Sequence, residues 1–245
     1  MYAYLFLGLL VVGTHAANVE KQAIQQGAKV IEAAQTGKKV RECSCEEQEK
    51  CVGEMKQQIQ GCFDGCWPII EKDFKIVKKP DTLKQCFTGK KYVVDDILEC
   101  LQSDAKTCVK GKDGPQVEYT DIKLFLDKGE KKLHKQANAL TTAFGDDGKE
   151  VIDAAFKVGK CMKDCFLKKN AGGFCFDKAE CQPKIEADDA PNAVQKCIKQ
   201  IGWKKQAHEL CQCSTKAGVE GMEKYCGLID TVAKSNAKIP TARRR

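Results

Sequence analysis

The chain has 245 residues, of which 41 are Lys or Arg, 34 are Asp or Glu and 16 are Cys, and its formal net charge is +7. No run of residues approaches the ~20 apolar positions that a membrane-spanning helix needs, which excludes an integral membrane protein. Aromatic residues are sparse and are not interleaved with arginine, so the composition also argues against a nucleic-acid-binding protein.

Residues 1–16 are predicted to be a secretory signal peptide. They contain no Asp, Glu, Lys or Arg, they hold an apolar run from Leu5 to Val12, and small residues stand at Thr14 and Ala16. This pattern is typical of a leader cleaved after Ala16, although a basic residue at its start is missing. The predicted mature protein is soluble, secreted and extracellular.

The apolar spacing of the first part of the mature chain predicts helices. Residues 18–35 place apolar side chains three and four apart, as an amphipathic helix does. Ser44 and Glu47 match a capping box, in which the hydroxyl accepts from a helix-start amide and the carboxylate reaches back. We therefore expect a helix from this point to Cys66, ended by Pro68.

Further helices are expected on both sides of a break. Pro80 restarts the structure, and residues 92–104 read as a helix. The glycines and proline of 109–118 mark a break. A stripe of seven apolar or small residues then runs from Ile122 to Phe144, which indicates a helix of about six turns. Residues 145–148, Gly-Asp-Asp-Gly, are expected to stop it.

The remaining chain continues in the same manner. A helix follows the capping pair Asp147 and Glu150 and ends at the glycines 172–173, and later helices are predicted over 191–210 and 216–234. No segment alternates as a strand does. The predicted fold class is all-α: a disulfide-rich helical bundle with two related cysteine-stapled halves, joined by a cysteine-free helical pair that packs antiparallel.

The cysteines form two sets of eight, separated by the cysteine-free segment 109–160. The pair Cys62 and Cys66 returns as Cys161 and Cys165, and in each set a later pair follows with thirteen residues between its members. Matched spacing of this kind indicates an internal duplication. All sixteen cysteines are predicted to form disulfides: Cys43, Cys45, Cys51, Cys62, Cys66, Cys86, Cys100, Cys108, Cys161, Cys165, Cys175, Cys181, Cys197, Cys211, Cys213 and Cys226.

Helix geometry limits how these cysteines can pair. Positions i and i+4 share a helix face, so each CxxxC pair is expected to bond outward to a neighbouring element. Cys43 and Cys45 are too close to bond comfortably with each other, as are Cys211 and Cys213, so each pair is expected to send bridges in two directions. Spacing alone selects no connectivity. Zinc sites usually contain CxxC pairs or interleaved histidine, which the chain lacks, so no metal is predicted.

This organisation divides the chain into five segments. They are the signal peptide (1–16), an N-terminal helical disulfide-rich half (17–112), a cysteine-free helical segment (113–160), a C-terminal helical disulfide-rich half (161–235) and a basic tail (236–245).

No catalytic constellation stands out. None of the four serines beyond the signal peptide lies in a GxSxG elbow. His134 and His208 lie among lysines and are interpreted as surface or packing residues. The acidic pairs 146–147 and 188–189 lack the spacing of a calcium loop. The sequence therefore predicts neither an enzyme nor a bound cofactor.

The positive charge is concentrated in the last third of the chain. Residues 41–112 carry thirteen basic and thirteen acidic side chains, 113–160 carry eight and nine, and 161–245 carry sixteen and ten. Dispersed lysines are usually a solvated surface. The alternative is a face that binds an acidic extracellular polysaccharide or protein, with these candidate residues: Lys196, Lys199, Lys204, Lys205, Arg243, Arg244 and Arg245.

With its leader, CxxxC spacing, lysine-rich helices and tandem cysteine blocks, the chain resembles the small secreted cysteine-rich proteins of nematodes. Some of these are similar to chondroitin-proteoglycan and eggshell-associated proteins. The resemblance covers residues 43–226 and transfers no functional residue. The predicted mature chain has no Ser-Gly dipeptide and no N-glycosylation sequon. The resemblance therefore implies a matrix component or binder, not a glycan carrier.

Three functions are weighed on this basis. The first is a secreted non-enzymatic structural or interaction protein of the extracellular matrix. The second is a helical carrier of an apolar ligand, because residues 119–169 are rich in apolar side chains. The third is a secreted protease inhibitor, for which the segment between Cys175 and Cys181 would have to form an exposed rigid loop.

Overall fold

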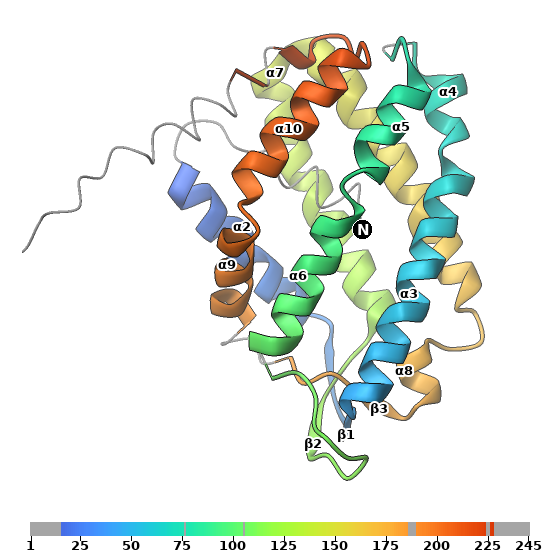
Figure 1. The fold of residues 1–245 in the computed structure, drawn as a ribbon, viewed down its shortest axis with the longest axis vertical. Helices are drawn as coiled ribbons and strands as arrows, with labels where there is room; N and C mark the ends of the chain where they lie inside the picture. Colours follow the sequence, from blue (N-terminus) through green and yellow to red (C-terminus); the bar gives the residue numbers. More distant parts are fainter. Residues whose placement is uncertain (1–15, 76, 105, 186–189, 224–225, 228–245) are drawn as a thin grey trace, which may run out of the picture.

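The computed structural model describes residues 16–75, 77–104, 106–185, 190–223 and 226–227. Over these ranges the chain is mostly helical, and several long helices run roughly along the longest axis of the molecule, with a small sheet at one end (Figure 1). Within them, no helix is both long and apolar enough to cross a membrane. The predicted signal peptide lies outside the described residues, apart from its last position.

The capping box predicted at Ser44 and Glu47, at the start of the helix that runs to Cys66, is confirmed. The Ser44 hydroxyl accepts from the Glu47 amide, and the Glu47 carboxylate accepts from the Ser44 amide at 3.0 Å. Pro68 follows the end of this helix and opens the next one, because its missing N–H is not needed in a first turn. The helices are α2 (Ala16–Glu32), α3 (Cys45–Cys66), α4 (Pro68–Asp73), α5 (Pro80–Thr88), α6 (Lys91–Asp104), α7 (Ile122–Lys169), α8 (Cys175–Lys178), α9 (Ala190–Gln200) and α10 (Trp203–Lys216).

Helix α7 doubles back on itself, so its two arms lie side by side (Figure 1). The His134 ring stacks on the Phe156 ring with 4.0 Å between centroids. Lys163 Nζ lies 2.8 Å from Asp127 Oδ1 on the other arm. Both pairs are spaced evenly about Gly145 in the sequence, which puts the reversal where the Gly-Asp-Asp-Gly segment was expected to stop the helix. The element nevertheless stays helical through this segment, whose side chains lie outside the described residues.

The C-terminal helices differ from the prediction in their bounds. The expected helix over 191–210 is divided into α9 and α10 by Gly202, which takes φ 62°, a left-handed conformation that costs glycine little. Residues 217–221 form turns and an isolated β-bridge between Val219 and Val77 instead of the start of a helix, and residues 228–234 lie outside the described ranges. At Gly218 a Cβ would lie 2.8 Å from the Lys78 side chain, so this turn requires glycine.

A small three-stranded sheet corrects the all-α prediction. Its order is β2-β1-β3, with β1 antiparallel to β2 and parallel to β3. The Gln182 side-chain amide donates to the Thr120 carbonyl and its oxygen accepts from the Thr120 amide, both at 2.9 Å. Cys43 and Cys181 form a disulfide beside the β1–β3 pairing. The strands are β1 (Gln35–Glu42), β2 (Gln116–Thr120) and β3 (Cys181–Gln182).

Eight disulfides account for all sixteen cysteines, which confirms the prediction that every cysteine is oxidised. The CxxxC pair of α3 bonds to the CxxxC pair of α7, whereas the Cys43/Cys45 and Cys211/Cys213 pairs each send bridges in two directions, as expected. The bonds are Cys43–Cys181, Cys45–Cys108, Cys51–Cys175, Cys62–Cys165, Cys66–Cys161, Cys86–Cys213, Cys100–Cys197 and Cys211–Cys226.

The expectation that each half is stapled within itself is wrong. Only Cys45–Cys108 and Cys211–Cys226 join cysteines of one half, and the other six bonds connect 17–112 with 161–235. The reason is the reversal of α7, which returns the chain along α3 and brings the second set of cysteines against the first. The two halves are therefore interlocked.

The main hydrophobic core lies where α3 and α4 meet the arms of α7. Its buried residues come from both sets of cysteine-containing helices and include the following: Ile59, Cys62, Phe63, Cys66, Trp67, Ile70, Val158, Met162 and Phe166. A second cluster surrounds Cys43, Cys51, Cys175 and Cys181 near the sheet. Five of the eight disulfides thus lie in or against these apolar clusters, where they are shielded from solvent reductants. The Cys45–Cys108 bond is not, because Cys45 is exposed.

Candidate functional site

The lysines proposed for polyanion binding lie on two consecutive helices. Lys196 and Lys199 are exposed on α9, and Lys205 is exposed on α10, where Lys204 is half-buried. Lys204 Nζ lies 5.9 Å from the centroid of the Trp203 ring. The three tail arginines, Arg243 to Arg245, lie outside the described residues, as does the rest of the basic tail.

The structure adds a second basic segment that sequence reasoning missed. Between α5 and α6 the chain runs Thr88-Gly89-Lys90-Lys91-Tyr92, and this junction packs against α10. Lys90 Nζ donates to Gln206 Oε1 at 2.8 Å and forms an ion pair with Glu209. The Tyr92 hydroxyl donates to the same Gln206 oxygen at 3.0 Å, while 47% of Tyr92 stays exposed.

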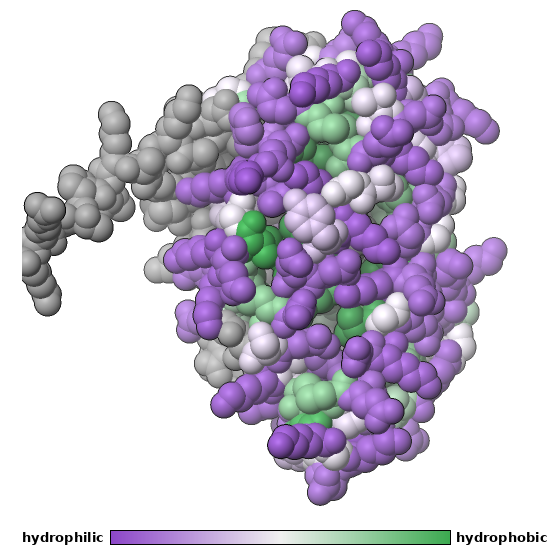
Figure 2. Space-filling view, in the orientation of Figure 1, coloured by the Kyte–Doolittle hydropathy of each residue, from purple (hydrophilic) through white to green (hydrophobic). Residues whose placement is uncertain are grey.

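We call the surface formed by Lys84, Lys90, Lys91, Tyr92 and Lys205 the junction face. Figure 2 shows that hydrophilic side chains cover most of the side of the molecule on which α5, α6 and α10 lie, with hydrophobic residues visible in narrow strips between them. An exposed tyrosine flanked by lysines is therefore unusual on this surface. Four of its members lie within residues 84–92, and only Lys205 comes from a distant part of the chain, so its proximity to the others cannot be inferred from the sequence.

The Glu209 carboxylate offsets part of the positive charge of the junction face. Burial lowers the pKa of Lys90, but the hydrogen bond to Glu209 and the charges of Glu209 and Tyr92 outweigh burial and raise it. The same hydrogen bond from Lys90 lowers the pKa of Glu209, so both groups stay ionised at neutral pH. Lys205 Nζ lies 3.8 Å from the same carboxylate, which therefore faces two cations.

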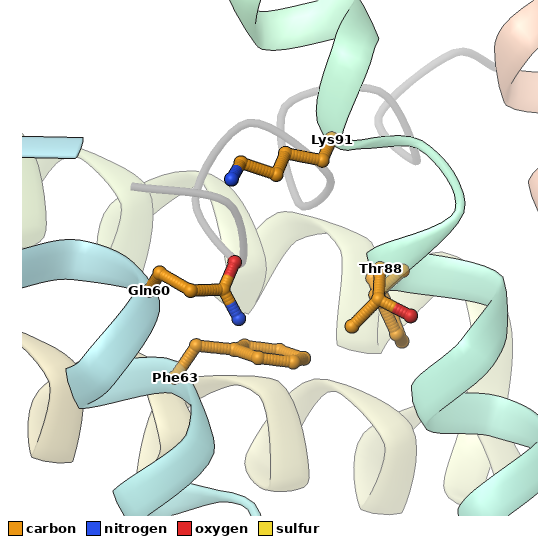
Figure 3. A pocket seen from close by; sticks show the side chains of 5 residues that line it. Gln60, Phe63, Thr88 and Lys91 are labelled. Carbon is orange, nitrogen blue, oxygen red and sulfur yellow. The ribbon is translucent and has the colours of Figure 1, made fainter. Parts of the chain in front are cut away.

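A shallow hollow opens between α3 and the junction (Figure 3). Its non-atom space, including the part open to solvent, is about 220 Å³. The Phe63 ring forms the floor, Gln60 and Lys91 reach over it from opposite helices, and Thr88 stands across from Gln60. Phe87 also lines it, and its ring centroid lies 6.3 Å from that of Phe63.

The nearest carboxylate to this hollow is already paired. Asp64 accepts from Lys84 Nζ at 2.9 Å and from Gln60 Nε2 at 3.1 Å. The hydrogen bond from Lys84, followed by that from Gln60, lowers the pKa of Asp64. Lys91 is exposed and forms no ion pair or hydrogen bond with any residue in the described part of the chain. Its ammonium group is thus the uncompensated charge beside the hollow.

The segments named for the other functions contribute residues to the apolar clusters. The segment proposed for protease inhibition forms the four-residue helix α8, a turn and the start of β3, with Cys175, Phe176 and Cys181 buried and Lys178 and Glu180 exposed. Among the apolar residues of 119–169, Met162 is buried in the main core and Leu126 packs against it. Among the described residues, no group of three or more His, Cys, Asp or Glu is placed to hold a metal ion.

Comparison with known proteins adds no relative to these observations. No family model, no curated protein and no solved structure matches the chain.

Proposed function

We propose that the protein is a secreted, non-enzymatic extracellular interaction protein that binds an acidic polysaccharide through its junction face and the neighbouring lysines of α9 and α10. The eight disulfides support an oxidising compartment, because intracellular thiols are kept reduced. The signal peptide predicted at 1–16 is a second, independent argument for export. A chain so heavily bridged suits a setting in which proteases are present.

The observation that carries the binding proposal is Tyr92. It is a large hydrophobic side chain that remains 47% exposed, although Gln206 of α10 fixes its hydroxyl. Lys90 Nζ lies 5.8 Å from the centroid of its ring. A sugar ring has an apolar face that can lie on an aromatic ring and substituents that can reach ammonium groups. An acidic polysaccharide therefore satisfies both parts of the junction face.

The same proposal includes a relation between the two halves. In the duplication, Cys62 corresponds to Cys161 and Cys66 corresponds to Cys165. If α3 and the second arm of α7 are exchanged on this basis, the Cys62–Cys165 bond becomes the Cys66–Cys161 bond. Exchange of α5 with α9 and of α6 with α10 also relates the α5–α10 bond to the α6–α9 bond, but only by helix. The matched spacing equates Cys100 with Cys211, whereas Cys86 bonds to Cys213 and Cys211 bonds to Cys226. This correspondence supports descent from a duplicated helical unit whose copies now bond to each other.

Chromatography on immobilised heparin tests the proposed function. We expect the oxidised protein to be retained above physiological salt, and the double variant Lys204→Gln/Lys205→Gln to elute at lower salt, because polyanion contacts weaken with ionic strength. The control is Lys50→Gln/Lys72→Gln, which removes the same charge from exposed positions on α3 and α4. Elution of the unmodified protein at or below physiological salt would rule out polyanion binding.

A further inference from the structure

One disulfide differs from the other seven in its exposure to solvent. In the Cys45–Cys108 bond Cys45 is exposed and Cys108 is half-buried, so neither cysteine is buried. In each of the other seven bonds at least one cysteine is buried and neither is exposed. All sixteen cysteines lie in the described part of the chain, so this comparison covers every bond. The Cys45–Cys108 bond is therefore the one that a dissolved reagent reaches most readily.

Hydrogen bonds on both sides of Cys108 hold its segment in place independently of the disulfide. The Cys45 amide donates to the Val109 carbonyl at 2.8 Å. The Gln48 side-chain amide donates to the Thr107 hydroxyl, also at 2.8 Å. These contacts come immediately after and immediately before Cys108 in the chain. Opening the disulfide therefore leaves the segment beside the start of α3, and the six bonds between the two halves are not affected.

The charges around Cys108 favour its departure as a thiolate. Lys106 and Lys110 flank Cys108 in the sequence, and both are exposed. Neither side chain forms an ion pair with another residue of the described ranges. Neighbouring cations stabilise a thiolate, and a more stable thiolate leaves a disulfide faster. Exposure thus directs an attacking group to Cys45, and the flanking lysines make Cys108 the better leaving group.

We propose that the Cys45–Cys108 bond is an exchange site at which the oxidised protein takes up an external thiol. The thiolate of that molecule attacks Cys45 Sγ, the Cys45–Cys108 bond breaks, and its electron pair leaves on Cys108 Sγ. The products are a mixed disulfide on Cys45 and a Cys108 thiolate, so the step consumes no separate oxidant or reductant. The other seven bonds stay closed and keep the fold. The site is distinct from polysaccharide binding, because it attaches a thiol-bearing molecule covalently.

Timed incubation of the oxidised protein with reduced glutathione, stopped with acid and followed by intact-mass analysis, tests the exchange site. We expect the first glutathione to add about tenfold faster than any later one, because exposed disulfides are the labile ones. Peptide mapping under non-reducing conditions should place this adduct on Cys45, with Cys108 open to alkylation. Circular dichroism should show an unchanged fold after the first addition.

A charge variant tests the role assigned to the lysines. Lys106→Gln/Lys110→Gln should slow the first addition about threefold, because the departing thiolate loses its neighbouring cations. Glutathione is itself an anion, so general attraction to a basic protein needs its own control. Lys50→Gln/Lys72→Gln removes the same charge from exposed positions on α3 and α4 and should leave the rate unchanged.

Two disulfide variants test whether the reaction belongs to this bond. Cys45→Ala/Cys108→Ala should stay folded and lose the fast addition. Cys211→Ala/Cys226→Ala removes the other bond within one half, whose cysteines are both buried, and should retain it.

Mapping of the unmodified protein decides the question even if a variant fails to fold. A fast adduct confined to Cys45 supports the exchange site. A first adduct on any other cysteine, addition to several bonds at one common rate, or no addition at all overturns it. Loss of the native circular dichroism spectrum with the first adduct also overturns it, because the bond would then be needed for the fold.

Discussion

The contact between α3 and α7 is built differently from the contact of α6 with α9. Two disulfides one helical turn apart join α3 to α7, and buried apolar residues such as Met162 and Phe166 fill the space beside them. One disulfide, Cys100–Cys197, joins α6 to α9 near the end of α6, and at the start of α6 the junction contacts α10 through polar groups such as Lys90. Apolar burial fixes the geometry on the α3–α7 side.

The difference separates a supporting side, α3 with α7, from the side on which binding is proposed, called the binding side below. Once Cys62–Cys165 has formed, the Cys66–Cys161 bond closes a loop of only about eight residues, so it restricts the unfolded chain little further. Once the α5–α10 bond has formed, the Cys100–Cys197 bond closes a loop of about 30 residues. It therefore restricts the unfolded chain more and contributes more to stability. Polar side chains on this second side can remain at the surface because the bridges hold the helices together.

The largest loss of stability should come from a substitution in the packed core between α3 and α7. Phe166 is buried in the main core, where its ring centroid lies 5.7 Å from that of Phe174. Phe166→Ala should lower the free energy of unfolding by about 4 kcal/mol, because it removes apolar contacts and leaves a cavity. Denaturant unfolding of the oxidised protein measures this. The matched change is Tyr92→Ala on the exposed side, which should cost less than about 1 kcal/mol, and equal costs would contradict the comparison.

The disulfides should rank by the loops that they close. The double variant Cys100→Ala/Cys197→Ala should lose about 3.6 kcal/mol, and Cys66→Ala/Cys161→Ala about 2.5 kcal/mol, because the second bond closes the shorter loop. Unfolding in urea with the other bridges intact gives both values. A larger loss for the α3–α7 pair would show that bonding, not packing, holds that side together.

Acid should act on the supporting side through Glu47. The hydrogen bonds from Arg41, at 2.8 and 3.0 Å, and those from Ser44 lower the pKa of Glu47 to about 2, against the effect of burial. Because the folded-state pKa lies below the unfolded value of about 4.3, the stabilisation is fully present above that pH and is lost as the pH falls toward 2. We expect a loss of roughly 1–3 kcal/mol, measured by unfolding at a series of pH values.

The control for this pH dependence lies on the binding side. Glu47→Gln should remove most of the dependence between pH 4.5 and 2. Glu209→Gln removes a carboxylate paired with Lys90 and Lys205 at the surface and should leave the unfolding midpoint unchanged within error, since exposed ion pairs contribute little. A steep dependence that survives in Glu47→Gln would assign the acid sensitivity to other groups.

Local signals in the sequence predicted much of the fold. The Ser44–Glu47 capping box, the proline at 68 and the apolar stripe from Ile122 act within a few residues of one another, so they could be interpreted without the tertiary structure. The strand β1 could not be predicted from local signals, because Gly37, Lys38 and Lys39 do not alternate with apolar residues. Its pairing depends on β2 and on a disulfide that closes a long loop.

The error in connectivity and the omission of the junction residues from the candidate set have a common cause. The spacing of cysteines within each half was interpreted as a boundary for bonding, but the reversal near Gly145 places one half against the other. The same reversal of α7 lets α10 meet the α5–α6 junction, where Lys90 and Tyr92 join Lys205 on one face. Sequence reasoning found Lys205 from its helix and missed Tyr92, whose partner Gln206 is 114 residues away.

Disulfide mapping of the oxidised protein tests the interlocked architecture most directly. Trypsin under non-reducing conditions cuts after Lys56, Lys72, Lys160, Lys163 and Lys168. The account predicts a three-peptide product in which 57–72 is bonded to both 161–163 and 164–168. Recovery of 57–72 with an internal bond, together with 161–163 bonded only to 164–168, would contradict it and would restore two separately bridged halves.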